Sequence, residues 1–438
     1  MEAVKSDLIV IGSGPGGYET AAEACHAGLK VTLIEKGHLG GTCLNRGCIP
    51  TKVYCHAAEL INSVGQFADY GLLSEKPTLD FARAAAKKDE VVTQLRQGVA
   101  LVLDGVNIVE GEAVLVDQST VKVGETHYVA PNVIIATGSV PSSLPIAGAD
   151  KAMTSDDLLS MTELPDSMII IGGGVIGIEF ANILNAFGVK VTVIEYCKEI
   201  LPPFDKDIAK RLRTLLTRRG IKFITSAQVT EITSEGVVYE SKGKQAVVDG
   251  DKVLMAVGRR AVMPAGTDTV GIETGKRGII VDNNMRTNVD GIYAIGDVNG
   301  LCQLAHAATA QGKVALAAIL GKESDVNLGI VPSAVYTTPE LAMTGLTEEA
   351  AAGRDIEVLK AMFRSNGKSL TMGETDGLVK LIVDKPSGKI IGCHIIGPHA
   401  SDLVQEVSTG MTLGLTLDQL KNAIHGHPTL SEILVAVR

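Results

Sequence analysis

Two cysteines that could carry out redox or metal chemistry lie five positions apart in the stretch GGTCLNRGCIPTK, residues 40–52. A regular α-helix would hold the Cα atoms of Cys43 and Cys48 about 8.6 Å apart, whereas a disulfide requires roughly 4.4–6.8 Å. The two cysteines are therefore unrelated, or they bind a metal, or the backbone bends until their sulfurs meet. Gly47, directly before Cys48, would ease such a bend.

A zinc site is one possible use of this pair, because Cys55 and His56 could complete a set of three cysteines and one histidine. The spacing is loose, however, and residues 50–62 have the pattern of a helix that places Cys55 and His56 on different faces. The seven cysteines of the chain are odd in number and scattered, which argues against a secreted disulfide framework. We therefore expect no metal and favour a catalytic pair.

The elements that must position this pair follow from an internal repeat. Residues 7–36 read DLIVIGSGPGGYETAAEACHAGLKVTLIEK, and residues 167–196 read SMIIIGGGVIGIEFANILNAFGVKVTVIEY. The two copies align without a gap at an offset of 160 residues, the separation of Gly12 and Gly172. Each copy predicts an apolar strand, a glycine turn, a helix with small residues and a second apolar strand that ends in glutamate.

Both copies contain the pattern G-x-G-x-x-G, which is typical of dinucleotide-binding turns. The first glycine allows the tight turn, the second lets the backbone approach a pyrophosphate, and the third lets helix and strand pack closely. The pyrophosphate then lies at the helix N-terminus, where free N–H groups favour negative charge. The six glycines are Gly12, Gly14 and Gly17 in the first copy and Gly172, Gly174 and Gly177 in the second.

A carboxylate ends each repeat at the point where a ribose hydroxyl is expected to donate to it. Glu35 and Glu195 each lie 23 residues after the first glycine of their copy. Two complete copies argue against a chance glycine-rich loop, and we infer two dinucleotide sites on two Rossmann-type domains. Glu195 would repel a 2′-phosphate and no arginine pair follows it, which favours NAD over NADP despite the nearby Lys198.

Two further segments, residues 133–141 and 291–300, pair a predicted buried strand with a glycine turn. In the second, Asp297 could accept a hydrogen bond from a polyol or ribityl hydroxyl, or cap its own backbone in the turn. After about residue 326 the pattern becomes strand, Pro-Ser-Gly turn and strand over residues 377–397, followed by a helix. We predict an α/β fold of two Rossmann-type dinucleotide-binding domains plus a C-terminal α+β dimerisation domain.

Composition limits the classes of partner. The 438 residues carry a formal charge of −10, and no basic block interleaved with aromatic residues is present, so we expect no nucleic acid. The longest apolar stretch, MIIIGGGVIGI, is stopped by Glu179 and is too short for a bilayer, so no membrane is expected. The chain enters a strand without the features of a signal peptide, which predicts a cytoplasmic location.

The stretch GGTCLNRGCIPTK resembles the redox-active motif of the class I pyridine nucleotide-disulfide oxidoreductases, and within them it looks most like the dihydrolipoamide dehydrogenases. The resemblance covers nearly the whole chain, including ATG, GDV, LAHAATAQG, YTTPELAMTG and HGHPTLSE. It implies a homodimer with FAD in the first dinucleotide site and NAD in the second. The implied domains are an FAD-binding domain in two parts (1–145 and 265–325), an NAD-binding domain (146–264) and a dimerisation domain (326–438).

The resemblance also implies roles for particular residues. Cys43 and Cys48 would form a redox-active disulfide, with Cys43 meeting the substrate and Cys48 lying against the flavin. Lys52 would contact the flavin and pair with Glu179. Further contacts with FAD are implied for Ala113, Thr137, Gly138, Asp297 and Ala305, and with NAD for Val229 and Gly258.

The motif HGHPTLSE adds a candidate base. Pro428 disfavours a helical backbone at His427 and points its imidazole out of the following helix. Glu432 could cap that helix, since TLSE fits a capping box. The resemblance instead makes Glu432 the carboxylate that orients His427, with His425 in a supporting role. In the resembling enzymes this pair comes from the other subunit, so each active site would be completed across a dimer interface.

The implied activity is oxidation of a protein-bound dihydrolipoyl group, with electrons passing through the cysteine pair and FAD to NAD⁺. The first strand begins too early for a preceding lipoyl domain, so we expect the lipoyl group on a partner protein of a 2-oxo acid dehydrogenase or glycine cleavage complex. Two departures from the resembling enzymes are Thr51, where serine is common, and a C-terminus six residues after Glu432, which could trim dimer contacts.

Four alternatives remain: a glutathione-reductase-like enzyme, a mercuric-reductase-like enzyme, a flavin-dependent transhydrogenase and a redox-inactive core protein of a complex. Glutathione reductases usually carry an arginine pair after the second ribose strand and a tyrosine where Val175 stands here. Mercuric reductases end in a further cysteine pair, whereas this chain ends LVAVR. The intact Cys43, Cys48 and His427 argue against the last two alternatives.

Overall fold

The computed structural model describes residues 3–72 and 77–438. The chain divides into two compact units, each made of segments far apart in the sequence. The first consists of Met1–Pro50, Ala85–Ser142 and Arg259–Leu328, and the second of Thr51–Ala84, Ser143–Gly258 and Gly329–Arg438. The four-part division expected from the sequence, with boundaries at 145, 264 and 325, stays a prediction.

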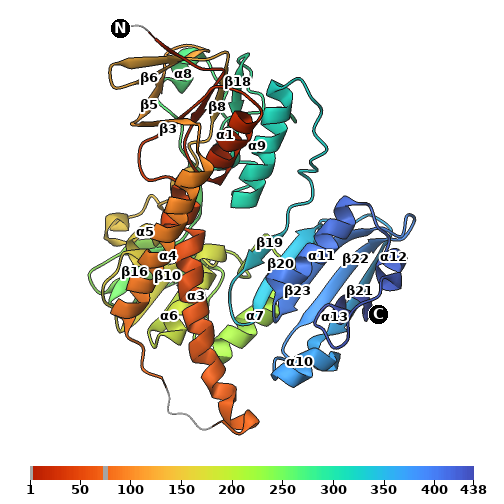
Figure 1. Cartoon of the computed structure of the whole chain (residues 1–438). Helices are drawn as coiled ribbons and strands as arrows, with labels where there is room; N and C mark the ends of the chain where they lie inside the picture. Colours follow the sequence, from red (N-terminus) through yellow and green to blue (C-terminus); the bar gives the residue numbers. More distant parts are fainter. Residues whose placement is uncertain (1–2, 73–76) are drawn as a thin grey trace. The chain divides into compact units, whose positions relative to one another are not determined.

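A parallel five-stranded sheet forms the centre of the first unit, with strand order β18-β8-β2-β3-β4 (Figure 1). Its strands are β18 (Ile292–Ala294), β8 (Asn132–Ile135), β2 (Leu8–Ile11), β3 (Val31–Glu35) and β4 (Asn107–Glu110). The run LIVI of β2 is buried, with every residue at most 4% exposed. Such continuous apolar runs suit parallel strands, because both faces of the sheet are covered.

Two helices, α1 (Pro15–His26) and α9 (Ala305–Ile319), lie side by side in the first unit and pack on one face of this sheet (Figure 1). Their close approach depends on glycine. A Cβ on Gly16 would lie 2.9 Å from the carbonyl oxygen of Ala308, and a Cβ on Gly312 would lie 1.9 Å from Oγ1 of Thr20. Larger residues at these two positions would force the helices apart.

The other face of the sheet packs against a smaller sheet of strand order β1-β7-β6-β5. An antiparallel pair, β9 and β17, lies outside both sheets. The remaining elements of this unit are β1 (Val4–Lys5), α2 (Gly41–Arg46), β5 (Ala113–Leu115), β6 (Thr120–Val123), β7 (Thr126–Val129), β9 (Ser139–Pro141), β17 (Arg259–Ala261), α8 (Thr267–Val270) and the 3₁₀ turn η3 (Gly296–Asn299).

The second copy of the repeat forms a parallel four-stranded sheet in the second unit, with strand order β12-β11-β10-β16. Helices α6 and α7 pack in its apolar cluster, and a three-stranded antiparallel sheet, β13-β14-β15, follows. The bounds are β10 (Ser167–Ile171), α6 (Val175–Ala186), β11 (Lys190–Ile194), α7 (Lys206–Arg218), β12 (Lys222–Ile224), β13 (Ala227–Ile232), β14 (Gly236–Ser241), β15 (Lys244–Asp249) and β16 (Lys252–Met255).

The C-terminal part of the second unit is a five-stranded antiparallel sheet of strand order β19-β20-β23-β22-β21, with α11 packed on it (Figure 1). The predicted strand, turn, strand and helix are confirmed as β22, β23 and α11. The bounds are β19 (Ser333–Val335), β20 (Glu340–Gly345), β21 (Ile356–Met362), η4 (Phe363–Ser365), α10 (Gly367–Met372), β22 (Leu378–Asp384), β23 (Ile390–Gly397), α11 (Ala400–Thr412), α12 (Leu417–Asn422) and α13 (Glu432–Val435).

Two helices, α3 and α4, have residues in both units. The second unit also contains the short elements η1, η2 and α5. The bounds of these five elements are α3 (Cys48–Ser63), η1 (Val64–Tyr70), α4 (Phe81–Val102), η2 (Ala149–Lys151) and α5 (Ser155–Leu159). The predicted fold class, two Rossmann-type units and a C-terminal α+β part, is confirmed. Over residues 3–72 and 77–438, none of the helices has the length and apolar character needed to cross a membrane.

A buried lysine joins the C-terminal sheet of the second unit to the start of α7. Lys380, on β22, is 1% exposed, and its Nζ lies 2.9 Å from Asp205, 3.1 Å from Asp207 and 2.5 Å from Glu348. Asp205 is also the N-cap of α7 and accepts the backbone N–H of Asp207. Although burial disfavours the charged ammonium, the bonds to Glu348 and Asp205 raise the pKa of Lys380.

Replacing this lysine should cost far more stability than replacing its neighbour in the sheet. Lys380→Met leaves the carboxylate of Asp205 buried without its counter-ion, so we expect the free energy of unfolding to fall by about 3 kcal/mol. Lys360 lies opposite Lys380 and binds the half-exposed Asp207, so Lys360→Met should cost less than about 1 kcal/mol. Guanidinium unfolding measures both; equal losses would contradict the role given to the buried pair.

Candidate functional site

The two cysteines lie on either side of a break between helices. Cys43 is in α2, and Cys48 is the first residue of α3. Between them, Gly47 has φ −142° and ψ −115°, outside the helical range, and a Cβ on it would lie 2.9 Å from the carbonyl oxygen of Thr42. The backbone therefore leaves the helical conformation between the cysteines, so the spacing of a regular helix does not apply to them. Cys43 is partly exposed and Cys48 is exposed.

The position of Cys48 favours a thiolate. The residue begins a helix of 16 residues, and the N–H groups at a helix start carry partial positive charge. A sulfur at such a position is stabilised in its negative form, which is the form that reacts in disulfide exchange. The local backbone thus combines a bend before Cys48 with the N–H groups of a helix start beside its sulfur.

Lys52 lies one turn after Cys48 in α3 and forms an ion pair with Glu179 of α6. Its Nζ is 2.9 Å from each carboxylate oxygen of Glu179, which is 4% exposed. The same Nζ lies 4.4 Å from the ring centre of Tyr336, and the backbone N–H of Tyr336 donates to Glu179 at 2.9 Å. The buried carboxylate is thereby neutralised, and an aromatic face lies against the ammonium.

Sequence reasoning gave Tyr336 no role. It begins the motif YTTPELAMTG, which contributed to the resemblance without any role being given to its individual residues. The contact joins residues 284 positions apart (336 − 52), so no local pattern could have indicated it. An aromatic residue directly after Val335, the buried last residue of strand β19, was the one available signal.

The two glycine turns have the same backbone geometry. Gly12 and Gly172 have φ +103° and +110°. A Cβ on either would lie 2.4 Å from a carbonyl oxygen at the end of the neighbouring strand, that of Ala136 after β8 or of Ala256 after β16. A Cβ on Gly17 would lie 1.9 Å from the carbonyl oxygen of Gly12, and a Cβ on Gly177 would lie 2.0 Å from that of Gly172. The first and third glycines of each turn are thus required by the protein itself.

The second glycine of each turn is different. A Cβ on Gly14 or Gly174 would have no heavy atom within 4 Å in the described chain. The helices that these glycines precede, α1 and α6, have no side-chain hydrogen bond at the N-cap. Open space beside a helix start with available N–H groups fits the pyrophosphate of a dinucleotide.

The glutamates that end the second strand of each copy accept hydrogen bonds from corresponding backbone N–H groups. Glu35 accepts the N–H groups of Ser13 at 2.8 Å and Gly37 at 2.7 Å. Glu195 accepts those of Gly173 at 2.5 Å and Cys197 at 2.6 Å, and each partner lies 160 positions after its counterpart. Both carboxylates are held at the turn and keep lone pairs for a ribose hydroxyl, since a carboxylate accepts up to about four bonds.

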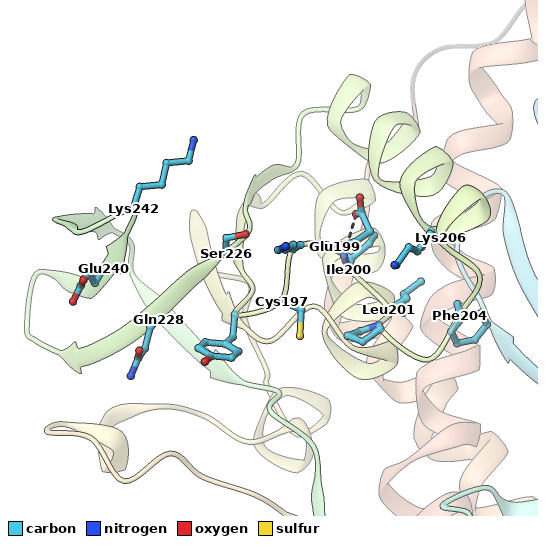
Figure 2. A pocket seen from close by; sticks show the side chains of 14 residues that line it. Cys197, Glu199, Ile200, Leu201, Phe204, Lys206, Ser226, Gln228, Glu240 and Lys242 are labelled. Atoms are coloured by element: carbon cyan, nitrogen blue, oxygen red, sulfur yellow. Dashed lines mark hydrogen bonds between the residues drawn. The ribbon is translucent and has the colours of Figure 1, made fainter. Parts of the chain in front are cut away.

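A pocket of about 630 Å³ lies beside the second turn (Figure 2). Its wall includes Cys197, Leu201 and Ser226. Leu201 and Ser226 have φ +50° and +54°, and their N–H groups donate to the carbonyls of Gly173 and Cys197. The wall is therefore tied to the turn through Gly173, and a left-handed backbone at two non-glycine residues is typical of a functional site.

Of two residues discussed from the sequence, Lys198 lines this pocket and Val229 is not among its lining residues. Lys198 lines it, together with Gln228 and Glu240, which are labelled in Figure 2. Val229 follows Gln228 in β13 but is itself buried, at 6% exposed. The pocket lies past the carboxyl end of β11, where parallel α/β sheets bind nucleotides.

Asp297 is oriented by a chain of hydrogen bonds. Its carboxylate accepts the hydroxyl of Ser139 at 2.5 Å. Arg259 in turn donates from Nε to the Ser139 hydroxyl at 2.8 Å and from Nη2 to the Ser139 carbonyl at 2.7 Å. Ser139 and Arg259 were missed from the sequence, although each directly follows a residue assigned to a cofactor, namely Gly138 and Gly258.

The remaining cofactor candidates lie at element ends. Thr137 donates its hydroxyl to the carbonyl of Val262 at 2.5 Å, and Gly138 has φ +71°. Ala305 begins α9, whose N-cap also has no side-chain hydrogen bond. Ala113 begins β5 and is buried. In the second unit, Gly258 has φ +108° and open space where a Cβ would lie.

The capping box that TLSE suggested is not formed, because α13 has Ser431 as its N-cap, with no side-chain hydrogen bond there. Glu432, the first residue of α13, instead lies beside the His427 ring. Its Oε1 lies 2.9 Å from Nδ1 of His427, and its Oε2 accepts the backbone N–H of Thr429 at 2.8 Å. The Thr429 N–H and, after it, the His427 ring hold the pKa of Glu432 below its ordinary value. His427 is 77% exposed, so the imidazole is oriented by a carboxylate on one side and accessible on the other.

Cys55 and His56 lie on different faces of α3, as predicted. Cys55 is buried, and burial raises the pKa of its thiol. His56 is 68% exposed and lies 3.1 Å from Glu59. Apart from residues 1–2 and 73–76, which are not described, the chain shows no group of three His, Cys, Asp or Glu side chains that could hold a metal ion.

Known proteins resemble the chain over nearly its full length. Residues 6–312 match the family described as pyridine nucleotide-disulphide oxidoreductase, and residues 331–438 match the dimerisation domain of that family. The dihydrolipoyl dehydrogenase of Geobacillus stearothermophilus is 41% identical over 446 residues, which cover 98% of this chain and 95% of that protein. That of Chlamydia muridarum is 39% identical over 440 residues, with the same coverage of both.

Among solved structures, the HOCl-induced flavoprotein disulfide reductase RclA from Escherichia coli has a similar fold. The TM-score is 0.87 and the sequence identity 31%, over 98% of this chain and 99% of that chain.

Substitution of the third glycine of a turn should affect stability, whereas substitution of the second should affect binding of a dinucleotide. Gly17→Ala places a Cβ against the Gly12 carbonyl, so we expect a loss of about 1–3 kcal/mol in unfolding free energy. Gly14→Ala meets open space and should change stability by less than about 0.5 kcal/mol, while weakening retention of a bound dinucleotide. Denaturant unfolding and the absorbance retained after gel filtration measure the two effects; a Gly14→Ala protein that binds as wild type would contradict the assignment.

Proposed function

The chain belongs to the pyridine nucleotide-disulphide oxidoreductase family, and from this membership we propose that it oxidises dihydrolipoyl groups with NAD⁺. It is an oxidoreductase that uses FAD and NAD(H). The observation that carries the proposal is the arrangement of Cys43 and Cys48 at a helix break, in a chain that matches dihydrolipoyl dehydrogenases over 98% of its length.

We assign FAD to the first glycine turn and NAD to the second. Glu35 and Glu195 would accept the ribose hydroxyls, and Asp297, held by Ser139, would accept from the ribityl chain. FAD, when bound, accepts two electrons from the dithiol, and NAD⁺ takes up the resulting hydride. The other residues proposed for FAD are Gly12, Gly14, Gly17, Lys52, Ala113, Thr137, Gly138 and Ala305; those proposed for NAD are Gly172, Gly174, Gly177, Val229 and Gly258.

The protein's own chemistry in this proposal is thiol–disulfide exchange. His427 accepts the proton of one dihydrolipoyl thiol, and the thiolate attacks Sγ of Cys43 in the Cys43–Cys48 disulfide. The S–S bond breaks, and Cys48 leaves as a thiolate at the start of α3. The second substrate thiol attacks the substrate sulfur bonded to Cys43 and closes the lipoyl disulfide. Its proton passes to Cys43, which leaves as a thiol.

Lys52 is the proposed link between the cysteines and the flavin. The ammonium is held by both oxygens of Glu179 and by the ring of Tyr336. A cation fixed in this way, one turn after the thiolate of Cys48, would favour negative charge on the sulfur and on the neighbouring cofactor.

The proposed assembly is a homodimer that acts on a lipoyl-bearing protein. Residues 331–438 match a dimerisation domain, and the exposed imidazole of His427 would complete the active site of the partner subunit. The partner protein would belong to a 2-oxo acid dehydrogenase or glycine cleavage complex.

A second candidate function is reduction of a disulfide at the expense of a reduced pyridine nucleotide. It is favoured by the similarity to RclA, which is 31% identical over nearly the whole chain. The cysteine pair and cofactors would serve both directions, so the substrate distinguishes the candidates: dihydrolipoamide for the first, and glutathione disulfide or another disulfide for the second.

Substrate preference and one cysteine substitution test the proposal together. We expect rapid oxidation of dihydrolipoamide with NAD⁺ and slow reaction with NADP⁺ or with glutathione. Cys43→Ser should lower the rate by more than about 10³-fold and leave FAD bound, whereas Cys25→Ser, in α1, should leave the rate unchanged. A Cys43→Ser enzyme that turns over normally would exclude the disulfide mechanism, and a preference for glutathione disulfide would favour the second candidate.

His427→Gln should separate proton transfer from electron transfer. Loss of the base should slow dihydrolipoamide oxidation by about 10²–10⁴-fold, while reduction of an artificial dye by NADH, which needs no thiol proton, should stay within about twofold of wild type. Steady-state rates of both reactions measure the difference. Equal losses in both would indicate a misfolded protein and remove the support for His427 as the base.

A further inference from the structure

Two histidines lie two positions apart in HGHPTLSE, and their surroundings differ. His427 is 77% exposed, and its Nδ1 lies beside Glu432. His425 is 10% exposed, and both of its ring nitrogens have partners. Its Nε2 lies 2.7 Å from Oε1 of Glu406 on α11, and its Nδ1 lies 2.9 Å from the carbonyl oxygen of Ala423.

Both partners of His425 are acceptors, since a carboxylate and a carbonyl oxygen have no proton to donate. A neutral imidazole has one N–H and could satisfy only one of them, whereas the imidazolium has two and satisfies both. Although burial alone disfavours the charged ring, the bonds to Glu406 and to the Ala423 carbonyl raise the pKa of His425. The geometry therefore selects the doubly protonated ring.

We propose that His425 is a positioning residue: as an imidazolium it clamps residues 423–428 to α11 and so holds His427 in place. The clamp joins the backbone of Ala423 to the side chain of Glu406, which lies 19 positions away from His425. The proposal rests on the function proposed for His427. It extends that function by assigning the two histidines different tasks, one as base and one as support.

His425 cannot itself be the base while the clamp is closed, because neither ring nitrogen has a free lone pair. Its charge also acts on the neighbouring pair. Glu406 and Glu432 are the charged groups that face it, from α11 and α13, and the cation contributes to lowering the pKa of Glu432. The ionised Glu432 accepts the Nδ1–H of His427 at 2.9 Å, which leaves Nε2 to take the substrate proton.

The clamp makes stability depend on pH in a defined direction. The pKa of His425 is higher in the folded chain than its ordinary value of 6.5. Its contribution to stability is therefore complete below pH 6.5 and is lost as pH rises through the raised pKa. The loss should therefore appear at a higher pH than the titration of a histidine with the ordinary pKa of 6.5.

Thermal unfolding of the FAD-loaded enzyme between pH 6 and pH 9 tests this clamp without measuring activity. His425→Gln should lower the unfolding midpoint by about 2 °C or more at pH 6, and the difference from wild type should shrink as pH approaches 9. His56→Gln is the matched control, because His56 also lies beside a glutamate but is 68% exposed. A His425→Gln difference that is the same at pH 6 and pH 9 would overturn the proposal.

The partner carboxylate provides a second, independent measurement. If Glu406 and His425 form one clamp, the midpoint losses of Glu406→Gln and His425→Gln at pH 6 should be less than additive in the double variant. Simple addition of the two losses would overturn the clamp. These outcomes concern stability alone, so they remain distinguishable from a failure of the proposed reaction.

Kinetics then separate positioning from catalysis. His425→Gln should lower kcat for dihydrolipoamide oxidation by about tenfold, leave KM for NAD⁺ and NADH-driven dye reduction unchanged, and alter the pH profile of the thiol reaction. A loss as large as that of His427→Gln, about 10²–10⁴-fold, would make His425 the base and overturn its assignment as support. An unchanged kcat and pH profile would equally overturn it.

Discussion

The starts of α1 and α6 impose the constraint on which both dinucleotide-type units depend. A helix leaves its first N–H groups without partners, and these two helices provide no side chain to cap them. A ligand with negative charge satisfies them best, and the chain keeps space for it by placing glycine at Gly14 and Gly174. The flanking glycines are required by close backbone contacts within each turn, and the glutamate at the end of each second strand binds backbone N–H groups of the same turn.

Away from these turns, two buried charged side chains are each paired with an opposite charge from the same chain. Glu179 is paired with Lys52 and a backbone N–H, and Lys380 lies among three carboxylates. The proposed catalytic pair is the opposite case, because His427 keeps one side of its ring at the surface. The contrast distinguishes groups that stabilise the protein from a group that must exchange a proton with a substrate.

Local patterns predict the repeats well, because each β-α-β unit is specified by neighbouring residues. The strands of both copies, the C-terminal hairpin and α11 were predicted from such local patterns, whereas the bend at Gly47 was one of three possibilities for the cysteine pair. Contacts between distant segments were not predicted. Tyr336 against Lys52, Arg259 behind Ser139 and Lys380 with Asp205 join residues more than 100 positions apart, where no periodicity connects them. Glu432 shows a third case: it holds the His427 ring, but the helix cap expected from TLSE is not formed, because α13 begins at Glu432 itself and its N-cap is Ser431.

The correspondence between the two turns has an experimental use. Ser13 and Gly173, like Glu35 and Glu195, occupy equivalent places and form equivalent hydrogen bonds, so the molecule contains two versions of one design under identical conditions. The Ser13 hydroxyl adds a bond to Glu35 that Gly173 cannot offer to Glu195. The two turns therefore differ at this one hydrogen bond to the glutamate, while the N–H groups bound by each glutamate correspond, and the first turn can serve as an internal reference for the second.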